Sequence, residues 1–480
     1  MKSCINTLLS ARLRRLFAAL SCTTLIALPA LPNAQAAETL PPAVAQSLKA
    51  AGIDTRNIGV FIQGVDASQP LLRHNAQRAL NPASAMKLVT TYAALELLGP
   101  AYTWKTEALV SAPPVDGLLA GNLYLRGSGD PRLMQEHAWL LLRQLRNRGV
   151  RDIGGDIVLD RGAFALPPHD PAAFDNDPLR PYNAGADALL VNLASLQLAL
   201  RPDAARGRVE VTSETAGEPA PIDNRLTLTQ DACGEWRERF KVRVVGETLE
   251  LTGPFAASCG EKTLHLSPWP ADTQVGALLR GLWTELGGTL RGTVHAGSTP
   301  AAAETLAVQT SPPLGDVVRD VNKFSNNVMA RQIFLSLDPA RPATYDGARR
   351  RIERWLAGKN LRVGELVLDN GSGLSRKERI SAEGLGQLLL AAWKSPSMPD
   401  LMASLPLAGV DGTLKKRFAD GPVNGRAHLK TGYLENARAL AGYVLDQSGK
   451  RWVVVILIND ANARQGRAAM DELLRWVAAR

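Results

Sequence analysis

Short strand-like runs lie toward both ends of the chain, and in the first of them, at 57–65, apolar and polar residues alternate. The predicted strands are 57–65, 71–74, 426–431, 439–445 and 451–458, the first two forming a hairpin. Helical spacing follows at 462–480, where one face is apolar. The two ends together favour a sheet on which helices pack, an α/β (α+β) fold.

The middle of the chain has a different pattern. Short strand-like runs separated by Gly, Pro and Asp extend from about 103 to 305, with helical spacing around 136–146 and 275–286. The 480 residues are enough for two or three domains. We expect a discontinuous domain, 37–102 and 306–480, interrupted by a β-rich accessory insert of two subdomains at 103–305.

The first 36 residues have the pattern of a secretory signal. Three arginines at 12–15 precede an apolar stretch at 16–31, and Ala34-Gln35-Ala36 fits a cleavage site. We therefore expect cleavage near Ala36 and a periplasmic protein. A lipoprotein attached through Cys22 is the weaker alternative, because Ala19 stands where a large aliphatic residue is expected. In an exported chain the remaining pair, Cys233 and Cys259, is expected to form a disulfide.

Composition and charge exclude several classes of protein. Hydrophobic residues make up 45% and charged residues 21%, which excludes a largely disordered chain. The net charge of +9 falls to +5 without the signal, and no basic run tracks a phosphate backbone, so we expect no nucleic-acid partner. The six histidines lack ligand spacing, so we expect no metal or cofactor. The helix at 462–480 allows at most peripheral membrane association.

Three short motifs carry candidate chemistry. Ser84-x-x-Lys87 follows Asn81-Pro82, a helix start, so the two side chains are expected on one face in the first helical turn. A neutral lysine there can take the proton of a serine nucleophile. Alone, the pair also fits an ordinary helix serine beside a solvated lysine. Ser325-x-Asn327 and Lys430-Thr431-Gly432 follow in that order, which makes chance unlikely.

These motifs together resemble the penicillin-recognising acyl-serine enzymes. Longer segments at 121–131, 369–376 and 409–414 are similar to class C low-molecular-mass penicillin-binding proteins of the penicillin-binding protein 4 type. The resemblance implies a penicillin-binding/β-lactamase-like transpeptidase domain with helices around an antiparallel sheet. Ser325 stands 241 residues after Ser84, which leaves room for the accessory insert that the family carries, with its cysteine pair.

The resemblance implies a role for each motif residue. Ser84 would be the nucleophile and Lys87 its general base, with a pKa depressed by Lys430. Ser325 would relay a proton to the leaving amine. The remaining roles are an amide contact from Asn327, carboxylate binding by Lys430 and Thr431, close backbone approach at Gly432, and oxyanion binding by the N–H groups of Ser84 and Tyr433.

The family also has a pocket for the free amine of the diaminopimelate side chain. The matching positions here are Asp160, Phe164 and Arg376. Two residues depart from the family pattern: Tyr433 replaces a small hydroxyl residue, and Glu435 matches a polar amide position. Because of these two departures, the family pattern does not define which substrate side chain this chain prefers.

The expected function is a serine D-Ala-D-Ala carboxypeptidase and endopeptidase that acts on peptidoglycan peptides and is inhibited covalently by β-lactam antibiotics. One alternative is a β-lactamase, although no segment clearly offers the glutamate and asparagine of its water site. The other is a non-catalytic peptidoglycan-binding protein, although all three motifs are intact.

Overall fold

The computed structural model describes residues 37–480 apart from 216, 218, 219 and 362. The expected signal peptide, 1–36, lies outside these residues. Among the helices of the described residues, none has the length and apolar character needed to span a membrane.

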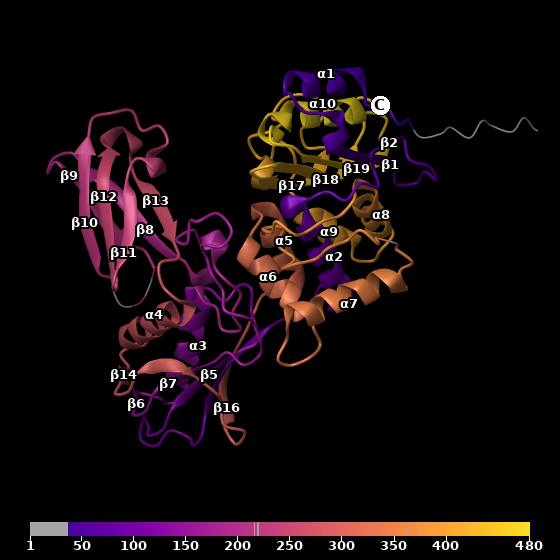
Figure 1. The fold of residues 1–480 in the computed structure, drawn as a ribbon. Helices are drawn as coiled ribbons and strands as arrows, with labels where there is room; N and C mark the ends of the chain where they lie inside the picture. Colours follow the sequence, from indigo (N-terminus) through magenta and orange to yellow (C-terminus); the bar gives the residue numbers. More distant parts are fainter. Residues whose placement is uncertain (1–36, 216, 218–219, 362) are drawn as a thin grey trace, which may run out of the picture. The chain divides into compact units, whose positions relative to one another are not determined.

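One antiparallel sheet joins strands from both ends of the described chain (Figure 1). Its order is β17 (Ala427–Leu434), β18 (Ala437–Leu445), β19 (Arg451–Asn459), β1 (Ile58–Gly64) and β2 (Leu72–His74). Residues 58–64 of β1 pair with 452–458 of β19, and β1 forms a hairpin with β2. The five predicted strands and the hairpin are confirmed.

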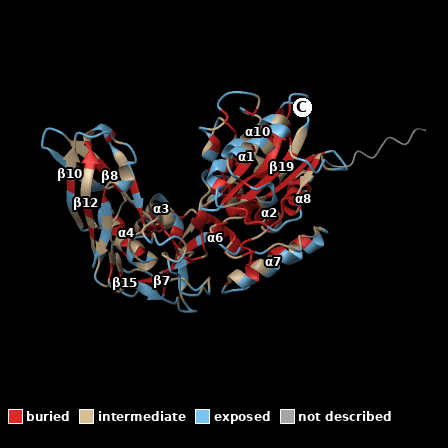
Figure 2. Cartoon of the chain, turned by 45° about the horizontal axis from the view of Figure 1, so that its top comes forward, coloured by how far each residue is buried: buried red, intermediate tan, exposed pale blue. Residues whose placement is uncertain are grey.

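This sheet is buried on both faces, which explains the unbroken apolar run of β19. The odd-numbered residues of β19 from Val453 to Leu457 lie in a core with α2 (Lys87–Leu97) and α8 (Ala382–Trp393). The even-numbered residues from Val454 to Ile458 enter a second core with α1 (Pro42–Ala50) and α10 (Arg467–Ala478). Figure 2 shows β19 and α2 as largely buried.

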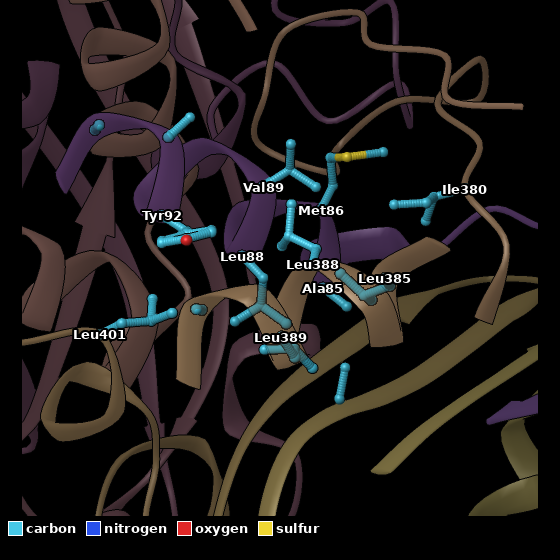
Figure 3. Packing of buried hydrophobic residues seen from close by; sticks show 14 of the residues in the cluster. Ala85, Met86, Leu88, Val89, Tyr92, Ile380, Leu385, Leu388, Leu389 and Leu401 are labelled. Carbon is cyan, nitrogen blue, oxygen red and sulfur yellow. The ribbon is translucent and has the colours of Figure 1, made fainter. Parts of the chain in front are cut away.

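The core around α2 holds the helices that carry two of the three motifs. Leu88 and Tyr92 of α2 belong to the same buried cluster as Leu389 of α8 and Leu401 of α9 (Figure 3). The other helices of this layer are α5 (Leu314–Phe324), α6 (Asn327–Ser336), α7 (Tyr345–Gly358) and α9 (Met398–Ser404). Because α2 is buried on nearly all sides, its first residue, Lys87, has no access to water.

The middle of the chain forms three further sheets. The first contains β8 (Leu196–Asp203), β9 (Arg208–Ser213), β10 (Ile222–Thr229), β11 (Lys241–Val245), β12 (Thr248–Ala256) and β13 (Lys262–Leu266). The second contains β3 (Lys105–Val110), β5 (Leu123–Gly127), β7 (Ile157–Asp160), β15 (Val294–Gly297) and β16 (Glu304–Thr310). The third contains β4 (Leu118–Leu119), β6 (Asp152–Ile153) and β14 (Thr289–Leu290).

Two structural details of this β-rich stretch agree with the sequence. The helices α3 (Gln135–Asn147) and α4 (Ala271–Glu285) lie at the two expected places and share a core with β5 and β7. Cys233 and Cys259 form a disulfide beside the core of the six-stranded sheet. The three sheets confirm the β-rich character that the sequence predicted for this stretch.

Candidate active site

Ser84 and Lys87 lie on either side of a helix start. The serine is in a 3₁₀ turn, Ala83–Met86, and α2 begins only at Lys87. This corrects the expectation that Ser84 occupies the first turn of an α-helix. Ala83 has a φ of +47°, and its N–H donates to Asn81 Oδ1 over 2.8 Å, so a local turn precedes the helix. The expected pairing is retained, because Lys87 Nζ donates to Ser84 Oγ over 3.1 Å.

Two glycines let other segments approach the serine turn. A Cβ on Gly432 of β17 would lie 2.4 Å from the carbonyl oxygen of Pro82. A Cβ on Gly373 would lie 2.0 Å from the carbonyl oxygen of Ala83 and 2.7 Å from the Cα of Ser84. The backbone that approaches Gly432 is thus the chain's own. A side chain at either position would displace the serine.

Lys87 is completely buried, at 0% exposed. Its Nζ also donates to Asn327 Oδ1 over 2.6 Å and to the carbonyl oxygen of Ser372. Burial lowers the pKa of Lys87 well below its ordinary value, and the charges of Lys430 and Arg331 lower it further. The sequence-based expectation named only Lys430, whereas burial is the larger cause. An amine whose pKa is lowered in this way gives up its proton more readily, and once deprotonated it can accept the proton of Ser84.

The second motif connects two helices. Ser325 ends α5 in the left-handed conformation, with φ 57° and ψ 38°. Asn326 then caps α6, because its side chain accepts the N–H of Met329 over 3.0 Å. Asn327 is the first residue of α6, and this tight connection directs its amide oxygen to Lys87.

Lys430 lies on β17 and is also 0% exposed. Its Nζ donates to Ser325 Oγ over 2.9 Å and to the carbonyl oxygen of Thr431 over 2.8 Å. Burial lowers the pKa of Lys430 to about 7. The structure therefore brings the three motifs together through two hydrogen-bonded pairs, Lys87 with Asn327 and Lys430 with Ser325.

A cavity of about 990 Å³ lies over these groups. Ser84, Ser325 and Asn327 line it, whereas Lys87, Lys430 and Gly432 are buried. Thr431 of the third motif also lines the cavity, as do residues 433–437 after it, which include Tyr433 and Glu435. Tyr433 is 61% exposed, and its ring lies 3.4 Å from the guanidinium of Arg438.

The expected amine pocket is only partly assembled as predicted. Arg376 lines the cavity, but Asp160 and Phe164 are not among its lining residues. The Asp160 carboxylate instead accepts the N–H groups of Gly162, over 3.0 Å, and of Thr299, over 2.9 Å. The ring of Phe164 fills the space beside Gly129, where a Cβ would lie 2.2 Å from it. The Asp160 carboxylate is therefore engaged in backbone hydrogen bonds, and the Phe164 ring in packing against Gly129.

The structure places a different aromatic and carboxylate pair in the cavity. Phe174 lies 5.0 Å from the Arg376 guanidinium, which also donates to its carbonyl oxygen over 3.0 Å. The neighbouring Asp175 accepts the hydroxyl of Tyr182 over 2.8 Å and the side-chain amide of Asn183 over 2.7 Å. The sequence pattern did not predict this pair. The available signal was an aromatic residue beside an acid in a loop rich in Pro and Asp.

Fold and site together define the class of penicillin-binding proteins. The chain matches the D-Ala-D-Ala carboxypeptidase 3 (S13) family over residues 40–479 and belongs to that family. It is therefore a peptidase of the penicillin-binding protein 4 type, and the resemblance seen in the sequence is confirmed.

Similar proteins agree with this assignment. The D-alanyl-D-alanine carboxypeptidase of Actinomadura sp. (strain R39) is 30% identical over 438 residues, covering 87% of this chain and 80% of the relative. The crystal structure of penicillin-binding protein 4 from Haemophilus influenzae has a TM-score of 0.75 at 24% identity, covering 90% of this chain and 99% of that one. A penicillin G-acylated predatory endopeptidase from Bdellovibrio bacteriovorus, solved with an immunity protein, has a TM-score of 0.50 at 16% identity, covering 86% and 89%.

Proposed function

We propose that this protein is an exported D-Ala-D-Ala carboxypeptidase and endopeptidase that acts on peptidoglycan peptides through an acyl-serine intermediate on Ser84. The observation that carries the proposal is the hydrogen bond from the buried Lys87 Nζ to Ser84 Oγ, 3.1 Å long. An amine whose pKa is lowered by burial is a base for a serine hydroxyl near neutral pH.

Acylation begins when Ser84 Oγ forms a bond to the carbonyl carbon of the penultimate D-alanine and its proton passes to Lys87 Nζ. The backbone N–H groups of Ser84 and Tyr433 would hold the oxyanion, each contributing about 3 kcal/mol. The C–N bond then breaks. The leaving amine takes a proton from Ser325 Oγ, which Lys430 replaces across their 2.9 Å hydrogen bond. Water finally cleaves the ester, giving its hydroxyl to the acyl group and a proton to Ser84 Oγ. The proton that Lys87 took up then replaces the one that Lys430 gave away, which returns both amines to their starting state.

The cavity offers groups for each part of the substrate. Lys430 and Thr431 would bind the terminal carboxylate, and Asn327 the substrate amide. We assign the free amine of the side chain to Phe174 and Asp175, because both line the cavity and Arg376 contacts Phe174. Glu435 lines the same cavity. A cavity of about 990 Å³ also has room for a cross-linked peptide, which supports the endopeptidase activity.

We further propose the division of the chain into domains and its location. Residues 103–305 would be an accessory insert in the peptidase domain, 37–102 and 306–480. The antiparallel pairing of β3 with β16 supports this, because the chain then enters and leaves the insert on neighbouring strands. A periplasmic location follows from the pattern of residues 1–36 and fits the disulfide between Cys233 and Cys259.

Purified wall fragments test the function directly. We expect release of free D-alanine and the splitting of cross-linked dimers by the mature protein, both measured by mass spectrometry. Ser84→Ala should abolish hydrolysis and covalent penicillin labelling, while Ser47→Ala on α1 serves as a matched control. Labelling of the Ser84→Ala protein would disprove the nucleophile. Rapid turnover of penicillin would instead indicate a β-lactamase, and binding of wall fragments without hydrolysis a non-catalytic protein.

A further inference from the structure

Thr413 places a second hydroxyl beside the third motif. Its Oγ1 lies 2.9 Å from Oγ1 of Thr431, and both residues line the cavity over Ser84. Thr413 comes from a separate segment, the short 3₁₀ turn Gly412–Leu414, and it is exposed to the cavity. None of the roles assigned above uses this hydroxyl.

The turn that carries Thr413 is held on both sides. Before it, Asp411 accepts Lys323 Nζ over 2.6 Å and the N–H of Leu407 over 2.8 Å. After it, Leu414 is fully buried. Gly412 has a φ of +56°, and a Cβ there would lie 2.7 Å from the carbonyl oxygen of Lys323. Since Lys323 is in α5, the helix that ends at Ser325, one ion pair connects the positions of Thr413 and Ser325.

Two hydroxyl groups at this separation suit a carboxylate. Each hydroxyl has a single proton, so in the free protein one donates to the other. Their oxygens are about as far apart as needed for each to donate to a different oxygen of one carboxylate. The neighbouring Lys430, whose Nζ donates to the carbonyl oxygen of Thr431, provides positive charge when protonated. Arg376 and Arg379 also line the cavity, opposite in charge to Asp175, Glu435 and Asp460.

We propose that Thr413 is a second carboxylate-binding residue, which together with Thr431 selects peptides that carry a free carboxylate next to the scissile amide. This inference rests on the proposed function and deepens it by naming a determinant of specificity. Ligand binding would break the Thr413–Thr431 hydrogen bond and turn the proton of each hydroxyl onto the substrate carboxylate. A hydrogen bond to a charged group is worth about 10- to 100-fold in kcat/KM.

The test compares Thr413→Val, which has the same shape without a hydroxyl, with Thr413→Ser, which keeps the hydroxyl. Two peptides are used, one ending in D-Ala-D-Ala and one ending in its C-terminal amide. In Thr413→Val the ratio of kcat/KM for acid to amide should fall about 10- to 100-fold, and Thr413→Ser should restore most of it. An unchanged ratio would overturn the proposal, whether activity on both peptides falls together or stays constant.

A second measurement separates this proposal from the proposed function. The rate of Ser84 acylation by penicillin G is compared with the rate for its methyl ester, in which the carboxylate is masked. Thr413→Val should lower the ratio of the two rates by a similar factor, and the same ratio in wild type and variant would count against the proposal. If the wild-type protein releases no D-alanine, the proposed function fails, but the penicillin comparison still tests Thr413.

Discussion

Lys430 Nζ lies 2.9 Å from Ser325 Oγ, which joins a strand of the sheet to the connection between two helices. Both ends of this hydrogen bond are held by backbone geometry. Lys430 is within the paired strand β17, and Ser325 has a left-handed conformation between α5 and α6. The two groups that we propose for proton transfer to the leaving amine are therefore in place before any substrate binds.

Replacing the proposed base should stop acylation without unfolding the protein. Lys87→Met retains most of the buried volume and removes the amine that accepts the Ser84 proton. We expect the rate of acylation by labelled penicillin to fall about 10²- to 10⁴-fold. Lys49→Met on the exposed side of α1 is the matched control and should keep the wild-type rate. An acylation rate in Lys87→Met within a few-fold of wild type would rule out Lys87 as the base.

The buried Lys430 should make stability depend on pH. Its pKa is about 7 in the folded protein and 10.5 as the ordinary value, so between these pH values the unfolded chain binds a proton that the folded chain lacks. The free energy of unfolding should therefore rise with pH from 7 to 10.5, by up to roughly 5 kcal/mol from this group. Urea denaturation across this range should show a smaller rise for Lys430→Met. Parallel curves for the two proteins would contradict a neutral Lys430.

A single methyl group on Gly432 should disrupt the site. In Gly432→Ala the new Cβ would meet the carbonyl oxygen of Pro82, so β17 or the turn carrying Ser84 must move. We expect acylation to fall about 100-fold, because misplacement by about 1 Å has an effect of this size. Gly358→Ala at the end of α7 is the control, since a Cβ there meets nothing within 4 Å. Equal acylation rates in the two variants would show that the close approach is not required.

Removing one carboxylate at a time tests which of two aspartates binds the free amine of the substrate's side chain. Asp175→Asn removes the carboxylate that lies in the cavity, and Asp160→Asn removes one engaged with the backbone of Gly162 and Thr299. We expect Asp175→Asn to lower the preference for peptides with a free side-chain amine about 5-fold. The preference should stay constant in Asp160→Asn. The preference is measured as the ratio of kcat/KM for peptides with free and with acetylated side-chain amines. A loss of preference in Asp160→Asn but not in Asp175→Asn would assign the amine to Asp160 instead.

Much of the candidate active site could be predicted because short local signals specify it. The spacing of Ser84 and Lys87 fixes their pairing whether the turn is α or 3₁₀, and Asn326 supplies a cap that starts α6 beside Asn327. The strands of the main sheet could be predicted equally well from the sequence. Alternation marks β1, and a run of mostly β-branched residues marks β19, both faces of which are buried.

The features of the site that were not predicted depend on contacts that no local sequence pattern indicates. Asp160 and Phe164 sit in a segment whose sequence matches a pocket, but the backbone donors of Gly162 and Thr299 and the space beside Gly129 hold them elsewhere. The 3₁₀ turn at Ser84 depends on the left-handed Ala83, which is unusual for alanine. Thr413 meets Thr431 because the Lys323–Asp411 ion pair and the buried Leu414 hold its turn in place.

The pairing of β1 with β19 has a consequence for synthesis. Ile58 is translated about 400 residues before its partner Ile458, so the nascent polypeptide cannot complete the central sheet until β17, β18 and β19 have emerged. Lys430 is likewise translated long after Ser84. A nascent chain without these strands lacks one of the proposed catalytic groups, so we expect hydrolytic capacity to arise only after they dock.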